Sequence, residues 1–397
     1  MKVVIAPDSF KESLSALQVA DAIEAGFRVV FPQAVVRKLP VADGGEGTVQ
    51  AMIDATGGRR VELDVTGPLG EPVPAFYGQL PAPEDGGAPL AVIEMAAASG
   101  LELVPPGRRD PLLATSRGTG ELILHALDAG VRRFVLGVGG SATNDGGAGM
   151  LQALGVRLVD AAGKELGAGG AELSRLAHID VSQLDPRVKD SEFHIACDVD
   201  NPLVGPRGAS AIFGPQKGAT PQMVAQLDAC LAHYAAVMTR DLGRDVADMP
   251  GAGGGGGIAA GMVVFLDGRL RPGIEIIAEA VGLEQAVREA DLVVTGEGRI
   301  DGQSVSGKTP VGVARIAARH GKPVIAIGGG LARDADAVHA HGIDAVFAAV
   351  CRPCTVEEAL AEARENLTAA ARNVAQALRL GAQLGRCMAG TGRPDKT

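Results

Sequence analysis

Apolar and polar positions alternate along the chain in blocks that predict strands and helices in turn. The opening KVVIAPDS has the continuous apolar character of a buried strand. The next block, SALQVADAIEAGFRVV, has helical periodicity with Ser13 or Ser15 as possible N-caps, and AVVRKLPV is a second strand. A further helix, TVQAMIDATGG, is expected to end at Gly57. This order predicts a βαβ unit at the start of the chain.

The pattern changes at about Val65, where shorter strands alternate with Pro and Gly turns, including the loose stretch PAPEDGGAP. The strands LAVIEM, RRFVLGVGG and FHIACD each run into polar or glycine-rich turns. After Ile274 an α/β pattern resumes with the strands DLVVTGEG, KPVIAIGGG and DAVFAAV. Between and after them we expect the helices TPVGVARIAARHG and DADAVHAHG, and one long amphipathic helix from Val356 to Leu380.

The similar units at the two ends predict an α/β fold with doubly wound parallel sheets, in which the termini build one domain and the middle is inserted. A length of 397 residues also favours about two domains. We expect residues 1–66 and 286–380 to form the discontinuous domain and residues 67–285 the inserted one. Residues 381–397 are expected to be a C-terminal tail with a frayed end.

The composition excludes some classes of function. Acidic residues outnumber basic ones by 47 to 37, aromatic residues make up 3%, and Trp is absent, so the basic face and stacking rings of a nucleic-acid-binding protein are missing. The chain starts directly with a strand and has no apolar run of about 20 residues, which predicts a cytoplasmic protein without a membrane contact. The 56 glycines cluster in a few loops, as expected where backbone approaches a ligand closely.

Two local patterns leave alternatives open. Cys351 and Cys354 form a CxxC between a predicted strand and a predicted helix, which fits either a thioredoxin-like redox site or an incidental pair among five sparse cysteines. The run MPGAGGGGGIAAGM is either a flexible linker or a tight contact with a ligand or a helix. The second interpretation is favoured, because linkers are usually rich in Ser or charge and this run continues into the apolar IAAGMVVFL.

Polar side chains gather where the predicted strands end, in five loops. Any one of these loops is explained by a simple turn, but five at one edge of the sheets are harder to dismiss. The loops are APDSFK (Asp8, Ser9, Lys11), PVADGGEGT (Asp43, Gly44, Gly45, Glu46), GVGGSATNDGGAG (Gly139, Gly140, Ser141, Asn144, Asp145), ACDVDNPL (Asp198, Asp200, Asn201) and VTGEGRIDGQSVSGKT (Glu297, Arg299, Asp301, Lys308).

Glycine-rich turns before helices bind anions through backbone N–H groups, and acidic side chains beside them can hold Mg²⁺. Phosphoryl transfer requires this mixture of a metal, positive charge and a base for the attacking hydroxyl. The five loops therefore favour phosphoryl transfer.

Two shorter patterns compete with that interpretation. GVGGSA followed by Asp160 fits a dinucleotide-binding fingerprint, but the turn continues as TNDGGAG where the fingerprint helix should begin. GQSVSGKT, residues 302–309, satisfies the P-loop string. A P-loop starts directly after a buried strand, however, whereas the strand DLVVT is expected to end at Thr295, so that the six residues GEGRID intervene before Gly302. Pro310 also removes a backbone donor where the nucleotide-binding helix should begin.

Long segments follow one another in order along the chain, among them APDSFKESLSA, VADGGEGT, IEMAAASGLELVP, TSRGTGELI, GGSATNDGGAGM, CDVDNPLVG, IFGPQKGA and TGEGRIDGQSVSGKTP. With these segments the chain resembles, from Met1 to about Leu380, the bacterial glycerate kinases of hexarate and glyoxylate catabolism. It implies phosphorylation of D-glycerate to 2-phosphoglycerate by ATP with Mg²⁺, without a P-loop. It also implies a discontinuous Rossmann- or flavodoxin-like domain, an inserted α/β domain and an active site in the cleft. A homodimer is one possible assembly of the chain.

With this substrate in view, residue roles can be proposed for the predicted site. Asp198, which directly ends the strand FHIAC, is the first choice for the base that orients the attacking hydroxyl, although a turn-capping aspartate would occupy the same place. Asp43 and Lys11 are the other catalytic candidates. Lys11 and Lys217 are equally consistent with solvated lysines. The remaining expectations are Asp43, Glu46 and Asp200 for Mg²⁺; Asp8, Ser9 and Lys11 for phosphates; Gly44 and Gly45 beside them; Gly139, Gly140, Ser141, Asn144, Asp145 and Asn201 for an anion; Arg117 for the carboxylate; and Glu297, Arg299, Asp301 and Lys308 for the opposite wall.

Other functions remain compatible with the sequence. Within the class, these are phosphorylation of the 3-hydroxyl or of another small hydroxy acid. Outside it, they are an NAD-dependent dehydrogenase and a non-catalytic ligand-binding protein with the same fold.

Overall fold

The structure is a computed structural model that describes residues 1–82, 86–305 and 308–390, and it divides the chain into two compact units. Unit 1 joins residues 1–42 to the residues from 278 onward, and unit 2 comprises residues 43–277. These boundaries differ from those expected after residues 66 and 285, because the helix of residues 48–56 packs against the sheet of unit 2. Part of the PAPEDGGAP loop, residues 83–85, lies outside the described residues.

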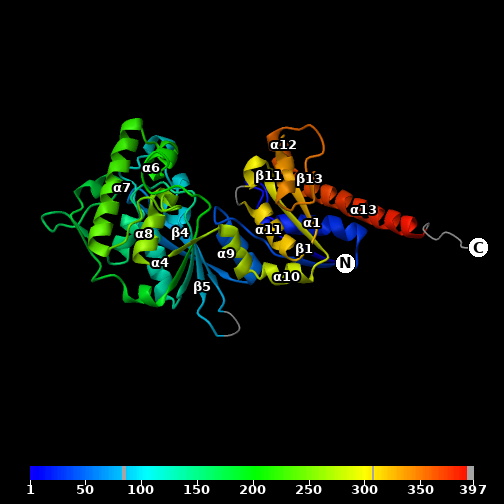
Figure 1. Ribbon diagram of the computed structural model, residues 1–397, viewed down its shortest axis with the longest axis horizontal. Coiled ribbons are helices and arrows are strands. Elements are labelled where there is room, and N and C mark those ends of the chain that lie inside the picture. The colour runs from blue at the N-terminus through cyan, green and yellow to red at the C-terminus, as the bar shows by residue number, and fades with distance from the viewer. Residues whose placement is uncertain (83–85, 306–307, 391–397) are drawn as a thin grey trace, which may run out of the picture. The chain divides into compact units, whose positions relative to one another are not determined.

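Unit 1 is a five-stranded parallel sheet in the order β13-β12-β11-β1-β2 with helices on both faces (Figure 1). Alternate residues of a strand face opposite sides. Val3 and Ile5 belong to the core formed with α1 and α13, whereas the buried Val4 and Val293 face the side where α10 and α11 pack. Counted within the unit, this is the flavodoxin-like strand order 2-1-3-4-5. The elements are β1 (Lys2–Ile5), α1 (Ala16–Val30), β2 (Val35–Lys38), α10 (Leu283–Glu289), β11 (Leu292–Ile300), η7 (Gly302–Val305), α11 (Thr309–Arg319), β12 (Val324–Leu331), η8 (Ala335–His341), β13 (Ala345–Ala348), α12 (Val356–Ala361) and α13 (Ala363–Gly390).

Unit 2 is built on a mixed six-stranded sheet in the order β10-β9-β6-β5-β4-β3. The strands β5, β6, β9 and β10 are parallel, so their carboxyl ends meet at one edge, and β3 and β4 add antiparallel strands. A separate antiparallel pair, β7-β8, completes the described strands. The strands are β3 (Arg59–Thr66), β4 (Pro72–Leu80), β5 (Leu90–Glu94), β6 (Arg133–Gly137), β7 (Arg157–Val159), β8 (His178–Asp180), β9 (Glu192–Ala196) and β10 (Arg269–Arg271).

Helices of unit 2 enclose a core that includes the buried rings of Tyr77, Phe134, Phe193 and Tyr234. Phe134 on β6 and Phe193 on β9 stack with ring centroids 4.6 Å apart. The helices are α2 (Thr48–Thr56), α3 (Ala96–Ser99), η1 (Leu101–Leu103), η2 (Pro106–Arg108), α4 (Arg117–Asp128), α5 (Ala148–Ala153), η3 (Gly170–Arg175), η4 (Pro186–Asp190), α6 (Ala209–Phe213), η5 (Pro215–Lys217), α7 (Pro221–Leu242), η6 (Gly254–Gly256), α8 (Ile258–Phe265) and α9 (Gly273–Ala280), which crosses the second boundary.

Helix ends follow the expected capping chemistry. Ser15 is the N-cap of α1: its hydroxyl accepts from Gln18 N and its own N–H donates to Gln18 Oε1, which completes a capping box. Gly57 ends α2 with φ of 70°. Both predicted helices are therefore confirmed.

The glycine run is a packed turn, not a linker. Gly253–Gly257 leads into α8 through η6, and four of the five glycines are buried. A Cβ on Gly256 would lie 2.0 Å from the carbonyl oxygen of Thr143, and φ of Gly256 is +75°. Only glycine fits here, which confirms the prediction of a tight contact.

The strand before the P-loop string is longer than expected. β11 continues to Ile300, because Gly296 brings it close to β12 and the pairing persists to Ile300 opposite Leu331. The prediction that this strand ends at Thr295 was wrong. Only Asp301 separates the strand from Gly302, but the next residues form the short 3₁₀ helix η7, and Pro310 occupies the first turn of α11. Residues 306 and 307 of the string lie outside the described residues.

The C-terminal third differs from prediction in three places. The segment DADAVHAHG forms the 3₁₀ helix η8, and the expected long helix is interrupted at Glu362 into α12 and α13. The expected tail from residue 381 is helical as far as Gly390, and its last seven residues, 391–397, lie outside the described residues. Among the described residues, no helix combines the length and the apolar character that crossing a membrane requires.

Candidate active site

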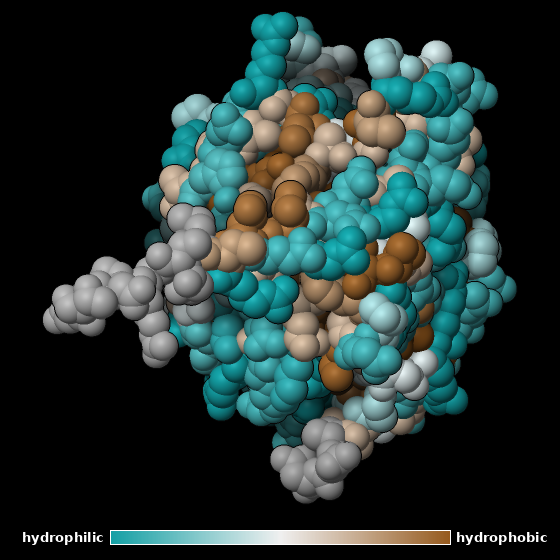
Figure 2. All heavy atoms as spheres, turned by 90° about the vertical axis from the view of Figure 1, so that its right-hand side faces the viewer, coloured by the Kyte–Doolittle hydropathy of each residue, from teal (hydrophilic) through white to brown (hydrophobic). Residues whose placement is uncertain are grey.

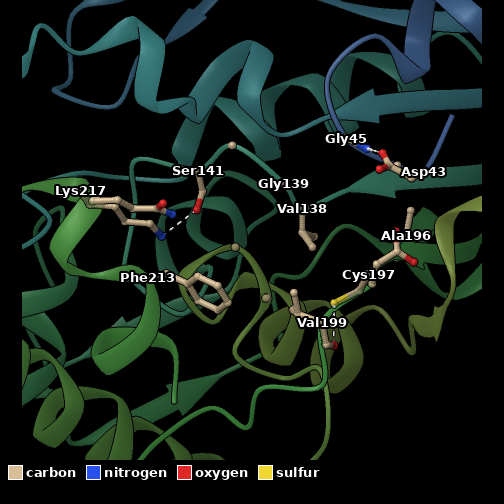
Figure 3. Close-up of a pocket in the computed structure, with 16 residues that line it drawn as sticks. Asp43, Gly45, Val138, Gly139, Ser141, Ala196, Cys197, Val199, Phe213 and Lys217 are labelled. Carbon is tan, nitrogen blue, oxygen red and sulfur yellow. Dashed lines mark hydrogen bonds between the residues drawn. The ribbon is translucent and has the colours of Figure 1, made fainter. Parts of the chain in front are cut away.

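A pocket of about 260 Å³ lies at the carboxyl edge of the parallel strands of unit 2 (Figure 3). It is enclosed by the loops after β6 and β9, the loop before α2, η5 and the glycine run. Figure 3 shows Lys217 with Ser141 on one side and Asp43 with Gly45 on the other. The predicted site residues that line it are Asp43, Gly44, Gly45, Gly139, Gly140, Ser141 and Asp198.

Asp198 combines a fixed position with a raised pKa. Its Oδ1 accepts a hydrogen bond of 3.0 Å from Gly273 N. Asp198 as a whole residue is exposed, but the surrounding loops partly desolvate its carboxyl group, which raises the pKa of Asp198 to about 6. The hydrogen bond from Gly273 N acts in the opposite direction. The negative charges of Asp43 and Glu275 add to the increase. Asp198 is thus still ionised at neutral pH and is a better base than an ordinary aspartate.

Lys217 is the basic side chain that lines the pocket. It is only 2% exposed, and its Nζ donates to Ser141 Oγ at 2.7 Å and to the Thr143 carbonyl at 2.6 Å. Burial lowers the pKa of Lys217 to about 7, while the charge of Asp145 opposes the decrease. The interpretation of Lys217 as a solvated lysine was wrong, because the GPQK turn carries it inward from η5.

Backbone amides border the same pocket. The N–H groups of Gly139 and Gly140, in the turn after β6, donate to no other group within the described part of the chain. Asn144 and Asp145 lie behind this turn. Both are fully buried, and Asp145 accepts from Ser116 N, Ser116 Oγ, Gly147 N and Gly149 N at 2.8–3.2 Å. With those hydrogen bonds Asp145 holds the loop together, and it is not among the residues that line the pocket.

A buried carboxylate fixes the loop that carries Asp43. Glu94 ends β5, is 7% exposed, and accepts a hydrogen bond of 2.7 Å from Val49 N at the start of α2. Burial raises the pKa of Glu94, and the amides of the first turn of α2 counteract this increase. A carboxylate is stabilised at a helix N-terminus. Sequence analysis missed Glu94, although an acidic residue at the end of an apolar strand was a usable signal.

The carboxylates of the pocket suit a magnesium ion. Asp43 Oδ1 accepts from Gly45 N and Asp198 Oδ1 from Gly273 N, so each Oδ2 is without a partner among the described residues. No group of three or more His, Cys, Asp or Glu side chains within the described ranges could hold a metal. Mg²⁺ nevertheless usually takes only one or two carboxylates together with substrate phosphates and waters. The donor set at Asp43 and Asp198 therefore fits Mg²⁺.

Besides Asn144 and Asp145, four more predicted site residues of unit 2 lie away from the pocket lining. Glu46 is exposed, and Arg117 begins α4, where its Nε is 3.1 Å from Glu121 Oε1. Asp200 is exposed and paired with Arg207 at 2.9 Å, and Asn201 donates to the Arg207 carbonyl.

A second group of predicted residues gathers in unit 1, at the carboxyl ends of β1 and β11. Thr309 Oγ1 donates to Asp8 Oδ2 at 2.9 Å, and Ser9 N donates to Asp8 Oδ1. Lys308 Nζ lies 3.8 Å from Glu297 Oε2 and 3.7 Å from Asp301 Oδ1. This is the edge at which flavodoxin-like sheets bind ligands, beside the point where the strand order reverses. Lys11 and Arg299 are also at this edge and line a separate cavity.

Among the residues that the structure describes, no cysteine forms a disulfide. Cys351 is exposed and Cys354 partly buried, in the connection between β13 and α12. Cys197, which sequence analysis did not select, lines the pocket of unit 2, and burial raises the pKa of its thiol.

Comparison with known proteins agrees with the class that this fold and pocket define, a two-unit α/β enzyme. The model of the glycerate kinase family matches residues 3–379. The glycerate kinase of Bacillus subtilis (strain 168) is 56% identical over 380 residues, covering 96% of this chain and 98% of the relative. The glycerate 2-kinase of Escherichia coli (strain K12) is also 56% identical, over 381 residues, covering 96% and 99%.

A solved structure shares the fold. A crystal structure from Salmonella typhimurium LT2, described as a glycerate kinase 2, superimposes with a TM-score of 0.88 at 57% identity and covers 96% of this chain and 99% of its own. The chain therefore belongs to the glycerate kinase family.

Proposed function

We propose that the protein transfers the γ-phosphoryl group of ATP to the 2-hydroxyl of D-glycerate. The observation that carries this proposal is the small pocket of unit 2, which pairs the raised-pKa carboxylate Asp198 with the buried Lys217. The family and the Escherichia coli relative, named glycerate 2-kinase, support the reaction and the position of transfer.

The size and polarity of the pocket suit a three-carbon acid. Its volume of about 260 Å³ is below the range of roughly 300–1,000 Å³ that drug-sized ligands occupy. In our proposal the substrate carboxylate takes hydrogen bonds from the amides of Gly139 and Gly140 and faces Lys217, while a hydroxyl faces Asp198. We no longer assign the carboxylate to Arg117, because Arg117 is exposed and paired with Glu121.

The proposed chemistry follows from these positions. Asp198 accepts the proton of the glycerate 2-hydroxyl while the oxygen of that hydroxyl bonds to the γ-phosphorus of ATP. The bond between the γ-phosphorus and the β,γ-bridging oxygen breaks at the same time, and ADP leaves. Asp43 is the residue that would hold Mg²⁺, which neutralises phosphate charge when bound. Glu94 keeps Asp43 in place through α2.

In unit 1 we assign Asp8, Ser9 and Lys308 to the phosphates of ATP, since they lie beside the point where the strand order of the sheet reverses.

One assay with product analysis tests the reaction. Purified protein with Mg²⁺, ATP and D-glycerate should release ADP, and phosphorus NMR should show 2-phosphoglycerate. Formation of 3-phosphoglycerate would keep the kinase and overturn the assigned hydroxyl. Absence of ADP release with D-glycerate, L-glycerate and other two- and three-carbon hydroxy acids would overturn the kinase and leave the binding-protein alternative.

We also propose a cytoplasmic homodimer. Exposed apolar side chains occur on unit 1, including Val29, Leu380 and Leu384, each more than half exposed. The space-filling view shows hydrophobic patches between hydrophilic side chains on one face of the molecule (Figure 2). Light scattering after size exclusion should give twice the mass of 40.2 kDa, and a monomer mass would overturn this assembly.

A further inference from the structure

Unit 1 contains a second cavity, of about 400 Å³, that the proposed chemistry does not use. Its walls come from the carboxyl ends of β11 and β12, the residues after β13, and the helix α12. Ala349, Val350, Ala359 and Leu360 make these walls largely apolar, and Phe10 closes them from the turn after β1.

Glycines form the floor of this cavity. A Cβ on Gly329 would lie 2.4 Å from the carbonyl oxygen of Gly298, so β11 and β12 lie close together there. A Cβ on Gly330 would meet no atom within 4 Å. The floor is therefore bare backbone, against which a flat ring can lie without displacing a side chain.

Polar groups are few and are arranged for an anionic ligand with an apolar end. Lys11 and Arg299 both line the cavity, and both are exposed cations. Lys11 is presented by a tight turn in which Phe10 and Leu14 exchange backbone hydrogen bonds at 2.9 Å. Within the cavity, Asn366 offers an amide that can both donate and accept. An apolar cavity suits the base of a nucleotide, and cations beside it suit the phosphates. The cavity also lies at the edge where flavodoxin-like sheets bind ligands, so these features together fit a nucleotide.

We propose that this cavity holds the adenine base and ribose of ATP, with Lys11 and Arg299 toward the phosphates. The assignment rests on the proposed kinase function for the identity of the ligand. It goes beyond that function because it gives the nucleotide its own binding site on unit 1 and names the residues that line it. The volume of about 400 Å³ lies within the range of roughly 300–1,000 Å³ that small-molecule sites occupy.

The test measures nucleotide binding to the full-length protein by calorimetry, without glycerate. Ala359→Trp places a large ring in the cavity. Ala361→Trp is the matched control, because Ala361 is exposed on the same helix and is not part of the lining. We expect Ala359→Trp to weaken binding of both ATP and adenosine by about tenfold or more, and Ala361→Trp to leave both unchanged. Lys11→Met should weaken ATP more than adenosine, because it removes only a phosphate contact.

Steady-state kinetics separates this assignment from the proposed reaction. Ala359→Trp should raise KM for ATP with KM for D-glycerate unchanged. If the wild type phosphorylates glycerate and Ala359→Trp binds ATP normally, the cavity is not the nucleotide site although the kinase stands. If the variants weaken ATP as expected and no glycerate is phosphorylated, the nucleotide site stands and the acceptor is wrong. If circular dichroism shows that Ala359→Trp does not fold, Gly330→Val fills the same cavity from its floor. Its affinity for ATP by calorimetry and its KM for ATP then test the assignment in the same way.

Discussion

Asp198 has a position that a side-chain replacement can preserve. In Asp198→Asn the amide oxygen can still accept the hydrogen bond from Gly273 N, so the loop should keep its shape while the base is lost. We expect kcat to fall by about 10² or more with little change in thermal stability. Asp200→Asn is the control two residues away, since Asp200 is exposed and paired with Arg207. A kcat of Asp198→Asn within a few-fold of wild type would remove Asp198 from the role of base.

Lys217 should make glycerate binding depend on pH. With a pKa of about 7, lowered from 10.5, the free protein carries this lysine largely neutral above pH 7. A bound carboxylate favours the charged form of Lys217, so at higher pH the binding of glycerate is accompanied by uptake of a proton from the buffer. Affinity should therefore fall as pH rises above about 7. Calorimetry at pH 8 in two buffers of different ionisation enthalpy should show uptake of about one proton per glycerate.

Lys217→Met provides the comparison for that measurement. The apolar side chain cannot take up a proton, so any residual glycerate binding should be independent of buffer. Equal proton uptake by this variant and the wild type would assign the titration to another group.

At the level of elements, the glycine run locks two loops of the pocket together. Gly256 has φ of +75° and its Cβ position lies 2.0 Å from the Thr143 carbonyl, while Gly146 N donates to the Gly256 carbonyl at 3.1 Å. Gly256→Ala should destabilise unit 2 by roughly 3 kcal/mol or more, through both the left-handed conformation and the clash. Gly243→Ala, at φ of +68° with no atom within 4 Å, should cost only about 1 kcal/mol.

Tyrosine fluorescence is a suitable probe of that difference. The chain has no Trp and two Tyr, Tyr77 and Tyr234, and both belong to unit 2. Urea unfolding followed at this signal reports the free energy of unfolding of unit 2. Equal losses for the two variants would mean that the contact with Thr143 adds nothing to the conformational cost.

The elements that were predictable from sequence are those with local signals. Ser15 and Gly57 marked helix ends by their own chemistry, and the strand β9 that leads to Asp198 followed from its apolar run. The end of β11 was not predictable, because its pairing to Ile300 depends on glycines of β12 that lie far along the chain. The burial of Lys217 was also not predictable from the sequence. It depends on the three-residue 3₁₀ helix η5, which is too short for hydrophobic periodicity to indicate which side chain is buried.

At the level of the whole molecule, each proposed ligand has its own unit. Every residue that lines the 260 Å³ pocket belongs to residues 43–277, and every residue that lines the 400 Å³ cavity belongs to the other unit. Ligand binding raises local stability, which hydrogen exchange detects as slower exchange of nearby amides. D-glycerate alone should therefore slow exchange in the loops around residues 138–141 and 254–255. ATP alone should slow it around residues 298–299, 329–330 and 349–350. Protection of both sets by either ligand alone would contradict a separate site on each unit.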